Sequence, residues 1–576
     1  MKKNKLFNLS LVMFFITVFL PKISFSQEII DVPTEWEGSP YGVINRFIMS
    51  DTTSSGERAH PNCIYRLKRG EYYDIDHALN VDFNFTLIGE SAPKGTRPAM
   101  VSRGVDAQGK YISGLINIIG DSTNVKFANI LFNGVQDDNK IVNQGGSLFG
   151  VFGTHHRFEI DSCVFSGWGG NLFNSRDAAR MTYIITNSIF RNGVDLDNPW
   201  SGNIYSQTTT TTYDDTIKFV NNTFFNNSSY QLLSWQFVDY IEYDHNTMLE
   251  TTLNAHWAPF LTNAKFTNNI FFNYQVVGET TYETEHGYWD KGGSNGNHRS
   301  SICKLDLVDP QVLLDHGMTE ADRKVEYSNN VYFWTQEVKN YWTTHKDSST
   351  GVELDILPIL WMNDYTKAMF DDNSGYPYFV EENNIEADPG FNADIVSALW
   401  KKELPFVINY RRHGYGGMVD PKERLYAPDG EFWDIAWPLP ESLVYTNENI
   451  KKHAKGNFPA GDLNWYPDKK AEWEDWVSGI SREETINLPS EYELSQNYPN
   501  PFNPSTEINF SIPVSANTTL AVYNVLGQKV ATLVNEKLSA GSYKYQFDAS
   551  NLSSGIYFYK LQSDDYSQVR KMMLLK

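Results

Sequence analysis

A six-residue pattern of apolar and polar positions recurs seven times between Phe127 and Tyr332. Positions one and six are large and apolar, position three is Asn in five of the seven units, and the positions between are mostly polar or β-branched. The third positions are spaced by 33, 25, 34, 24, 23 and 61 residues, a period typical of a solenoid, propeller or array. The units are Phe127–Phe132, Ile160–Phe165, Ile185–Phe190, Phe219–Phe224, Tyr243–Met248, Phe266–Phe271 and Tyr327–Tyr332.

Each unit predicts two short strands that meet at a corner, because its apolar positions lack a helical period. Asn suits the corner, since it tolerates the left-handed backbone conformation, and asparagines stacked about 4.8 Å apart can pair amide to amide. Three strands per repeat, with few Asn-Gly or Asp-Gly hairpin signals, favour a parallel β-helix over a propeller. The third strand precedes the first six units, at residues 115–118, 147–151, 171–175, 203–207, 231–235 and 256–260.

The longest spacing predicts an insertion at residues 274–324 within a β-helix of residues 27–333. In residues 334–487 the repeat fades, and nine of the 15 Trp occur there. We expect this Trp-rich region to cap or cover the stack, with helices at residues 356–370 and 393–402, because the terminal repeats of a solenoid need such protection.

The two ends of the chain differ in composition from its middle. Lys2, Lys3 and Lys5 precede an apolar run that ends at Leu20, which predicts a secretory signal peptide at residues 1–26. The last 89 residues hold seven acidic and seven basic side chains and no Trp, whereas residues 27–487 carry 37 Lys plus Arg against 63 Asp plus Glu. These shifts predict a domain boundary near Leu488.

The composition also narrows the class of protein. No stretch of the mature chain predicts a transmembrane helix. The acidic balance argues against nucleic acid as a partner, since phosphates need clustered Lys and Arg. The three Cys cannot form a disulfide framework, so packing must hold the fold.

Alternating apolar residues such as Ile508, Phe510 and Ile512, broken by Pro and Gly turns, predict a small antiparallel β-sandwich in residues 488–576. Its motifs are Leu494–Thr506, Val522–Gln528, Ser554–Phe558 and Lys571–Lys576. They closely resemble the type A C-terminal sorting domain of the type IX secretion system. The resemblance implies recognition by that machinery and a protein that is secreted, or attached to the outer cell surface, of a Bacteroidota-like Gram-negative bacterium. An ordinary immunoglobulin-like module is the alternative.

The middle of the chain resembles the right-handed parallel β-helix, or pectin-lyase-like, superfamily in its architecture. The expected fold is therefore all-β: a right-handed parallel β-helix with a Trp-rich C-terminal cover, followed by the sandwich. The resemblance implies that a polysaccharide lies in a groove between the third strands and the loops that follow each unit. The substrate-binding residues expected there are Trp168, Asn174, Trp200, Gln207, Trp235, Gln236 and Trp257.

A lyase acting on an acidic glycan removes a proton next to a uronate carboxylate, so it needs a base and a positive group. Arg176, Arg180 and His256 are the candidate catalytic residues. Calcium is the expected cofactor, with Asp177, Asp195 and Asp197 as its oxygen ligands.

Two alternatives to the lyase remain open. A glycosidase needs two carboxylates about 5–9.5 Å apart, for which Asp177 and Asp195 are a possible pair. A non-catalytic adhesin or glycan-binding surface protein needs neither arrangement. Convergence of Arg176, His256 and the Asp195 loop in one groove would favour the enzyme.

Overall fold

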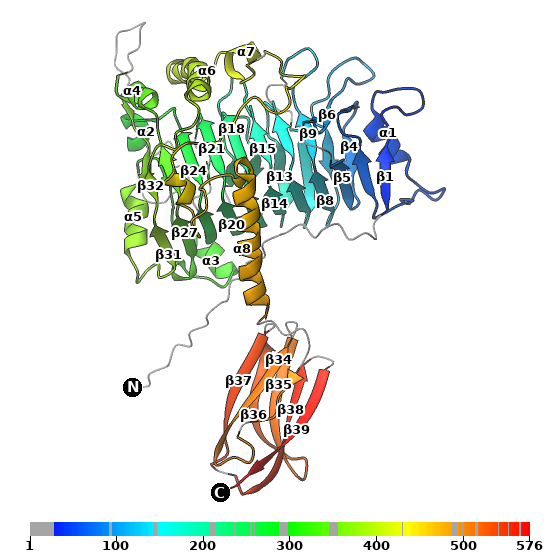
Figure 1. Ribbon diagram of the computed structural model, residues 1–576, viewed down its shortest axis with the longest axis vertical. Coiled ribbons are helices and arrows are strands. Elements are labelled where there is room, and N and C mark those ends of the chain that lie inside the picture. Colours follow the sequence, from blue (N-terminus) through cyan, green and yellow to red (C-terminus); the bar gives the residue numbers. More distant parts are fainter. Residues whose placement is uncertain are drawn as a thin grey trace. The chain divides into compact units, whose positions relative to one another are not determined.

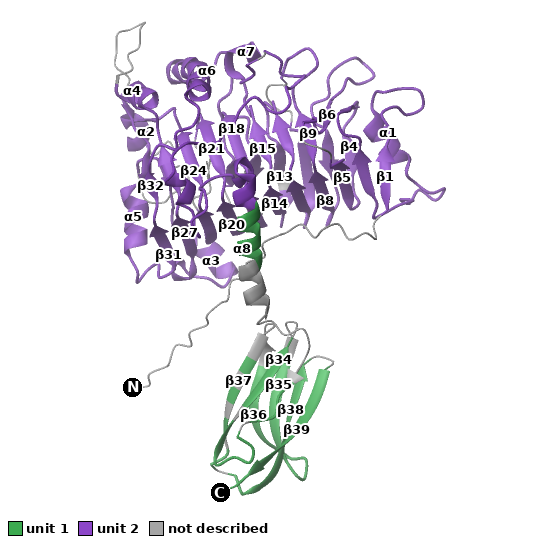
Figure 2. Cartoon of the chain, in the orientation of Figure 1, with its two compact units in different colours: residues 1–19, 471–576 green, residues 20–470 purple. Residues whose placement is uncertain are grey.

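The computed structural model of the chain describes residues 28–91, 95–141, 147–207, 213–234, 238–253, 256–257, 260–286, 298–344, 355–428, 430–486, 493–497, 499–512, 516–538, 541–550, 552–563 and 566–575. The chain forms two compact units, residues 20–470 and residues 471–576 together with 1–19 (Figure 1, Figure 2). The signal peptide expected at residues 1–26 lies outside the described residues.

The larger unit is a stack of parallel strands in three sheets, which is the predicted parallel β-helix (Figure 1). The first sheet contains, in spatial order, β1 (Ile29–Val32), β2 (Ile64–Leu67), β5 (Phe85–Gly89), β8 (Asn124–Ala128), β11 (Arg157–Asp161), β14 (Thr182–Thr186), β17 (Asp214–Val220), β20 (Val238–Asp244), β23 (Asn263–Thr267), β27 (Lys324–Ser328) and β31 (Phe379–Glu382). The second contains β3 (Tyr72–Ile75), β6 (Ala99–Arg103), β9 (Ile130–Asn133), β12 (Val164–Ser166), β15 (Ile189–Arg191), β18 (Thr223–Asn227), β21 (Thr247–Thr251), β24 (Ile270–Tyr274), β28 (Val331–Phe333) and β32 (Ile385–Glu386). The third contains β22 (His256–Trp257), β19 (Leu232–Ser234), β16 (Tyr205–Gln207), β13 (Phe173–Ala179), β10 (Phe149–Thr154), β7 (Ile116–Ile118) and β4 (Leu79–Val81).

Two further strand pairs complete this unit. The antiparallel pair is β25 (Glu279–Thr280) with β29 (Ile356–Leu357), and the parallel pair is β26 (Ser301–Cys303) with β30 (Leu360–Met362). Of the helix expected at residues 356–370, therefore, the first part forms strands, and only α5 (Asp364–Asp371) is helical.

Positions one and six of the repeat fill the interior of the stack. Successive coils are in register, so equivalent side chains lie above one another and are removed from water together. The stacked rings, with centroids 4.7–5.2 Å apart, are Phe132, Phe165, Phe190 and Phe224 in one column and Tyr243, Phe266 and Tyr327 in another.

Position three of all seven units adopts the left-handed conformation predicted for the corner, with φ between 52° and 60°. The amide ladder forms one position later than expected, because position four is the side chain that reaches both neighbouring coils. Asn269 Nδ2, for example, donates to Tyr243 O at 2.9 Å in the preceding coil and to Asn330 Oδ1 at 3.0 Å in the next. The ladder, with amide-to-amide distances of 2.8–3.1 Å, comprises Asn222, Asn246, Asn269, Asn330 and Asn384.

The stack continues beyond Phe333, where the sequence predicted its end. β31 and β32 carry an eighth unit, Glu381–Glu386, and its third position, Asn383, has a φ of 55°. The sequence pattern missed this unit because Glu381 and Glu386 occupy positions one and six. They are in register with Tyr327 and Tyr332, so carboxylates replace rings in the last coil.

The region that follows the stack covers the outer face of the second sheet, as predicted for a cover. α6 (Ala393–His413) and α7 (Pro421–Arg424) lie along one side of the stack (Figure 1), and the first part of α6 confirms the helix expected at residues 393–402. Apolar residues of the cover pack on outward residues of that sheet, such as Ile435 on Met100, Leu131 and Val164. Because both faces of the second sheet are covered, every residue of β6, β9 and β21 is buried, including polar ones such as Arg103 and Glu250. The other helices are α1 (Val43–Ser50), α2 (Thr281–Glu285), α3 (Pro310–Asp315), α4 (Gln336–Thr344) and α8 (Pro467–Ile486).

The C-terminal unit contains two antiparallel sheets and confirms the predicted β-sandwich. One sheet is β33 (Glu493–Leu494), β34 (Ser505–Ile512) and β37 (Gly541–Asp548), and the other is β36 (Lys529–Leu538), β35 (Ala516–Asn524), β38 (Gly555–Ser563) and β39 (Tyr566–Leu574). The alternating residues Ile508, Phe510 and Ile512 all point into its separate core.

Candidate functional site

The loop flank on which the sequence places the glycan groove lies under the cover. Gly416 N donates to Asp197 O at 2.5 Å, and Gly417 N donates to Asp197 Oδ1 at 3.1 Å. Asp195 is fully buried, and its Oδ1 accepts the backbone N–H groups of Asp197 at 3.0 Å and Asn198 at 2.9 Å. Asp195 thus holds the turn and Asp197 holds the cover, and calcium binding by these two residues stays a prediction.

In the part of the chain that the structure describes, there is no group of three or more His, Cys, Asp or Glu side chains that could hold a metal ion. The backbone of Asp177, the third expected ligand, lies in β13, but its side chain lies outside the described set.

Two of the expected stacking residues are part of the packing. Trp168 has no exposed surface, and its Nε1 donates to Asn203 O at 3.2 Å, so this ring has no free face for a sugar. Trp200 is half-buried, with its ring centroid 6.3 Å from both Tyr230 and Tyr410. Tyr410 belongs to α6, so Trp200 helps to seat the cover.

The remaining expected residues lie on or next to the third sheet. Asn174 is half-buried on β13, in register with Gly150 and Ser206. Trp235 and Gln236 lie outside the described residues, and only the backbones of Arg176, Gln207, His256 and Trp257 are described.

Arg180 is the expected catalytic residue whose side chain lies within the described part of the chain. It occupies the turn between β13 and β14 with a φ of 60°. Its Nε lies 2.7 Å from Asp215 Oδ1, and its Nη1 lies 4.0 Å from Asp239 Oδ2. Asp214 pairs with Val238 across β17 and β20, so Asp215 and Asp239 follow at adjacent positions, both beside this guanidinium.

Two rings complete this cluster, which we call the Arg180 corner: Arg180, Tyr213, Asp215, Asp239 and His316. The Arg180 guanidinium lies 4.6 Å from the Tyr213 ring centroid, and Nη1 donates to the Tyr213 hydroxyl. His316, which follows α3, packs edge-on against Tyr213 with centroids 4.7 Å apart. Fixed cation, carboxylates, phenol and imidazole therefore meet at one corner of the stack.

Burial raises the pKa of Asp239, and Asp215 raises it further, whereas Arg180 acts in the opposite direction. Beneath the corner, burial also raises the pKa of Asp214 to about 7. Asp214 is fully buried, and its carboxylate accepts hydrogen bonds from the Tyr205 hydroxyl and from Met181 N. Carboxyl groups with raised pKa beside a charged partner are characteristic of functional sites.

Of the residues in the Arg180 corner, the sequence predicted Arg180 but not Tyr213, Asp215, Asp239 or His316. A signal for two of them is present, because Asp215 and Asp239 each precede the third position of their unit by six residues. His316 carries no such signal, since it lies in the insertion, whose path across the stack the repeat does not specify.

Among the described residues, no helix is long and apolar enough to cross a membrane. Comparisons with curated proteins and with solved structures give no match for the chain. The model of one family, described as the secretion system C-terminal sorting domain, matches residues 496–575. The match confirms the sorting domain that the motifs of the tail predict, and the chain is thus a secreted or cell-surface protein in which a parallel β-helix carries a type IX secretion sorting domain.

Proposed function

We propose that the β-helix unit acts on a polysaccharide outside the cell and that the Arg180 corner hydrolyses its glycosidic bonds. The pair Asp215 and Asp239 carries this proposal, because both carboxylates lie beside one guanidinium and the pKa of one of them is raised. Glycosidases use a carboxyl that keeps its proton as general acid and a second, ionised carboxylate. Asp239 would protonate the glycosidic oxygen, and Asp215, paired with Arg180, would act as base or nucleophile.

A lyase acting on an acidic glycan is the second candidate. Arg180 supplies the cation that would neutralise a uronate carboxylate, while Tyr213 and His316 are groups that can transfer a proton. Two carboxylates already surround this cation, however, and residues 27–487 carry 37 Lys plus Arg against 63 Asp plus Glu. Repulsion of a polyanion by that charge favours an uncharged glycan unless an ion such as Ca²⁺ bridges the two.

The expected location follows from the two ends of the chain. A signal peptide at residues 1–26 would direct export, and the sorting domain would direct passage through the outer membrane of a Gram-negative bacterium. Detection of the protein on cells or in the medium, by fractionation of a strain that carries the gene, tests this assignment.

The activity is tested by incubating the mature full-length protein with neutral and uronate polysaccharides, with and without Ca²⁺. Hydrolysis releases reducing ends without unsaturated products, whereas a lyase produces unsaturated, absorbing ends. We expect hydrolysis of a neutral glycan and a loss of about 100-fold or more in Asp239→Asn, the usual contribution of a general acid.

Glu242→Gln is the matched control, because Glu242 lies on the same strand and pairs with Lys218 at 2.7 Å. Full activity in Asp239→Asn would overturn the assignment of the acid. Unsaturated products would identify the lyase, and binding without turnover would identify the non-catalytic glycan-binding protein.

A further inference from the structure

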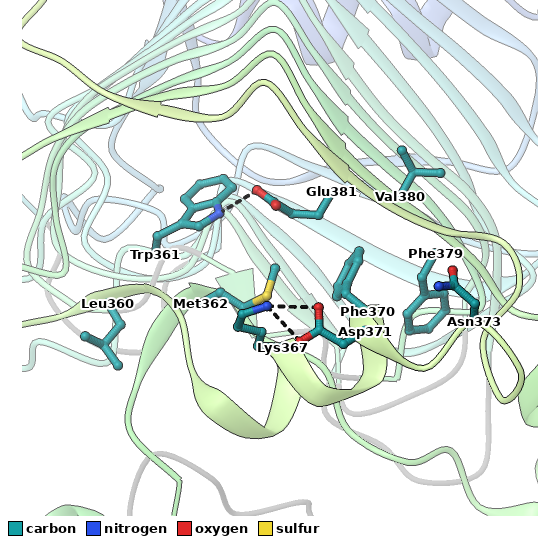
Figure 3. A pocket seen from close by; sticks show the side chains of 10 residues that line it. All are labelled: Leu360, Trp361, Met362, Lys367, Phe370, Asp371, Asn373, Phe379, Val380 and Glu381. Carbon is teal, nitrogen blue, oxygen red and sulfur yellow. Dashed lines mark hydrogen bonds and ion pairs between the residues drawn. The ribbon is translucent and has the colours of Figure 1, made fainter.

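A pocket of about 570 Å³ lies at the C-terminal end of the β-helix (Figure 3). Its walls come from β30, α5 and β31, and β30 and β31 are the last strands of their sheets. The volume lies within the about 300–1,000 Å³ of small-molecule sites. None of its lining residues belongs to the Arg180 corner, so it is a separate site.

The pocket has an aromatic wall. The Trp361 ring is half-buried and stacks on Tyr332 with centroids 4.8 Å apart and planes 10° apart. This contact occupies one face of the indole. Tyr327 and Phe271 form T-shaped contacts with the ring, with centroids 6.1 and 6.2 Å away, and the side chain also lines the pocket. Phe370 and Phe379, with centroids 5.1 Å apart, continue the apolar wall.

The polar groups of the pocket favour an uncharged ligand with hydroxyl groups. Lys367 Nζ lies 2.9 and 2.7 Å from the two carboxylate oxygens of Asp371, so these charges balance each other. Glu381 supplies the remaining charge, and its Oε1 accepts hydrogen bonds from Trp361 Nε1 at 3.1 Å and Asn384 Nδ2 at 2.7 Å. Within the described part of the chain, Oε2 of Glu381 accepts none, so it remains for a ligand hydroxyl.

An aromatic wall beside a carboxylate acceptor suits the binding of a sugar. The C–H face of a pyranose packs on an indole, and its hydroxyl groups donate charge-assisted hydrogen bonds to a fixed carboxylate. The carboxylate of a uronate would instead be repelled by the Glu381 carboxylate. We infer that the pocket at the end of the β-helix binds an uncharged hexose ring, which contacts both Trp361 and Glu381. The inference rests on the proposed function for its substrate class.

Titration calorimetry of the mature full-length protein with gluco-, galacto- and manno-oligosaccharides tests this site. We expect binding of at least one uncharged series and about tenfold weaker binding in Glu381→Gln, which loses the charge but keeps an acceptor for Trp361. Glu382→Gln is the control, since Glu382 is the next residue of β31, is exposed and does not line the pocket. It should leave the affinity unchanged.

Equal weakening in Glu381→Gln and Glu382→Gln, or no binding of any uncharged series, would overturn the inference, as would preference for the matching uronates. Asp239→Asn separates this site from the proposed function. If the Arg180 corner has no activity, oligosaccharide binding that depends on Glu381 still supports the pocket. If Asp239→Asn alone abolishes binding, the ligand lies at the corner and the pocket assignment fails.

Discussion

At the scale of single residues, the larger unit buries one arginine with a charged partner and another without a hydrogen-bond partner among the described residues. Arg424 is fully buried and forms an ion pair with Glu403, which is also fully buried. Arg103, on β6, is only 1% exposed, and its three guanidinium nitrogens have no hydrogen-bond partner among the described residues. Burial lowers the pKa of Arg103 to about 10. Its charge is therefore a cost that no partner offsets.

Replacing these two arginines should change stability in opposite directions. We expect Arg103→Met to raise the free energy of unfolding by about 1–4 kcal/mol, because it removes an uncompensated buried charge. Arg424→Met should lower it by about 3–5 kcal/mol, because Glu403 is left buried and unpaired. Urea unfolding followed by circular dichroism measures both changes. Destabilisation by Arg103→Met would mean that the guanidinium has a stabilising role in the fold.

Asp214 should make the larger unit less stable as the pH rises. Its pKa is about 7 in the folded chain, whereas an unfolded Asp has a pKa near 3.9. Between these values the folded chain binds the additional proton, so the free energy of unfolding falls with pH, by up to about 4 kcal/mol. Asp214→Asn should remove this dependence when unfolding is compared at pH 5 and pH 8. Asp364→Asn, at an exposed position, serves as the control and should follow the wild type.

At the scale of elements, the asparagine ladder ties each coil to the next. Asn269 makes four hydrogen bonds, two through Nδ2 and two through Oδ1. Each of them satisfies a polar group of an adjacent coil in the interior, where water cannot replace it. An unsatisfied buried group costs about 1–3 kcal/mol, so the ladder is a strong constraint on the register of the coils.

We expect Asn269→Ala to lower the free energy of unfolding by about 2–4 kcal/mol, since it leaves polar groups of both adjacent coils unsatisfied. Asn329→Gly is the comparison, because Asn329 is a corner residue with a φ of 54°, a conformation that Gly adopts freely. It should change stability by less than about 1 kcal/mol. Thermal unfolding of both variants checks the difference, and similar losses would contradict the separation of corner and ladder.

The elements that the sequence predicted are those set by local pattern and period. Large apolar residues at positions one and six, with Asn at most of the corners, fix the strands and their stacking, so the parallel β-helix could be predicted. The position of the cover could not, because contacts such as that between Arg191 and Glu441 join residues 250 apart without any repeat. For the same reason the sequence could not show that Asp195 accepts hydrogen bonds within its own turn and that Asp197 contacts the cover.

At the scale of the whole molecule, the chain combines two units with separate cores. The interior of the stack holds one large apolar cluster, and the C-terminal sandwich holds its own. The family match at residues 496–575 assigns sorting to the second unit, so the candidate sites and the sorting signal lie on different units. Each unit should therefore fold and act without the other.

Removing residues 488–576 tests this independence. We expect the remaining chain to keep the thermal transition and the activity of the β-helix, because its core is retained. In a strain with the type IX system the truncated protein should remain inside the cell envelope, which fractionation and immunoblotting would show. Its appearance on the cell surface or in the medium would mean that another signal directs secretion.

The carboxylates of the last coil bear on how the protein behaves when it is concentrated. Among the described residues, β31 and β32 pair with another strand on one side only, and such an edge can pair with another chain. Glu381 and Glu386 occupy the repeat positions that hold Tyr327 and Tyr332 in the coil before. An added coil would have to stack directly on these two glutamates. A second molecule that docked there would bury both charges, and we expect that cost to oppose end-to-end polymerisation of the protein.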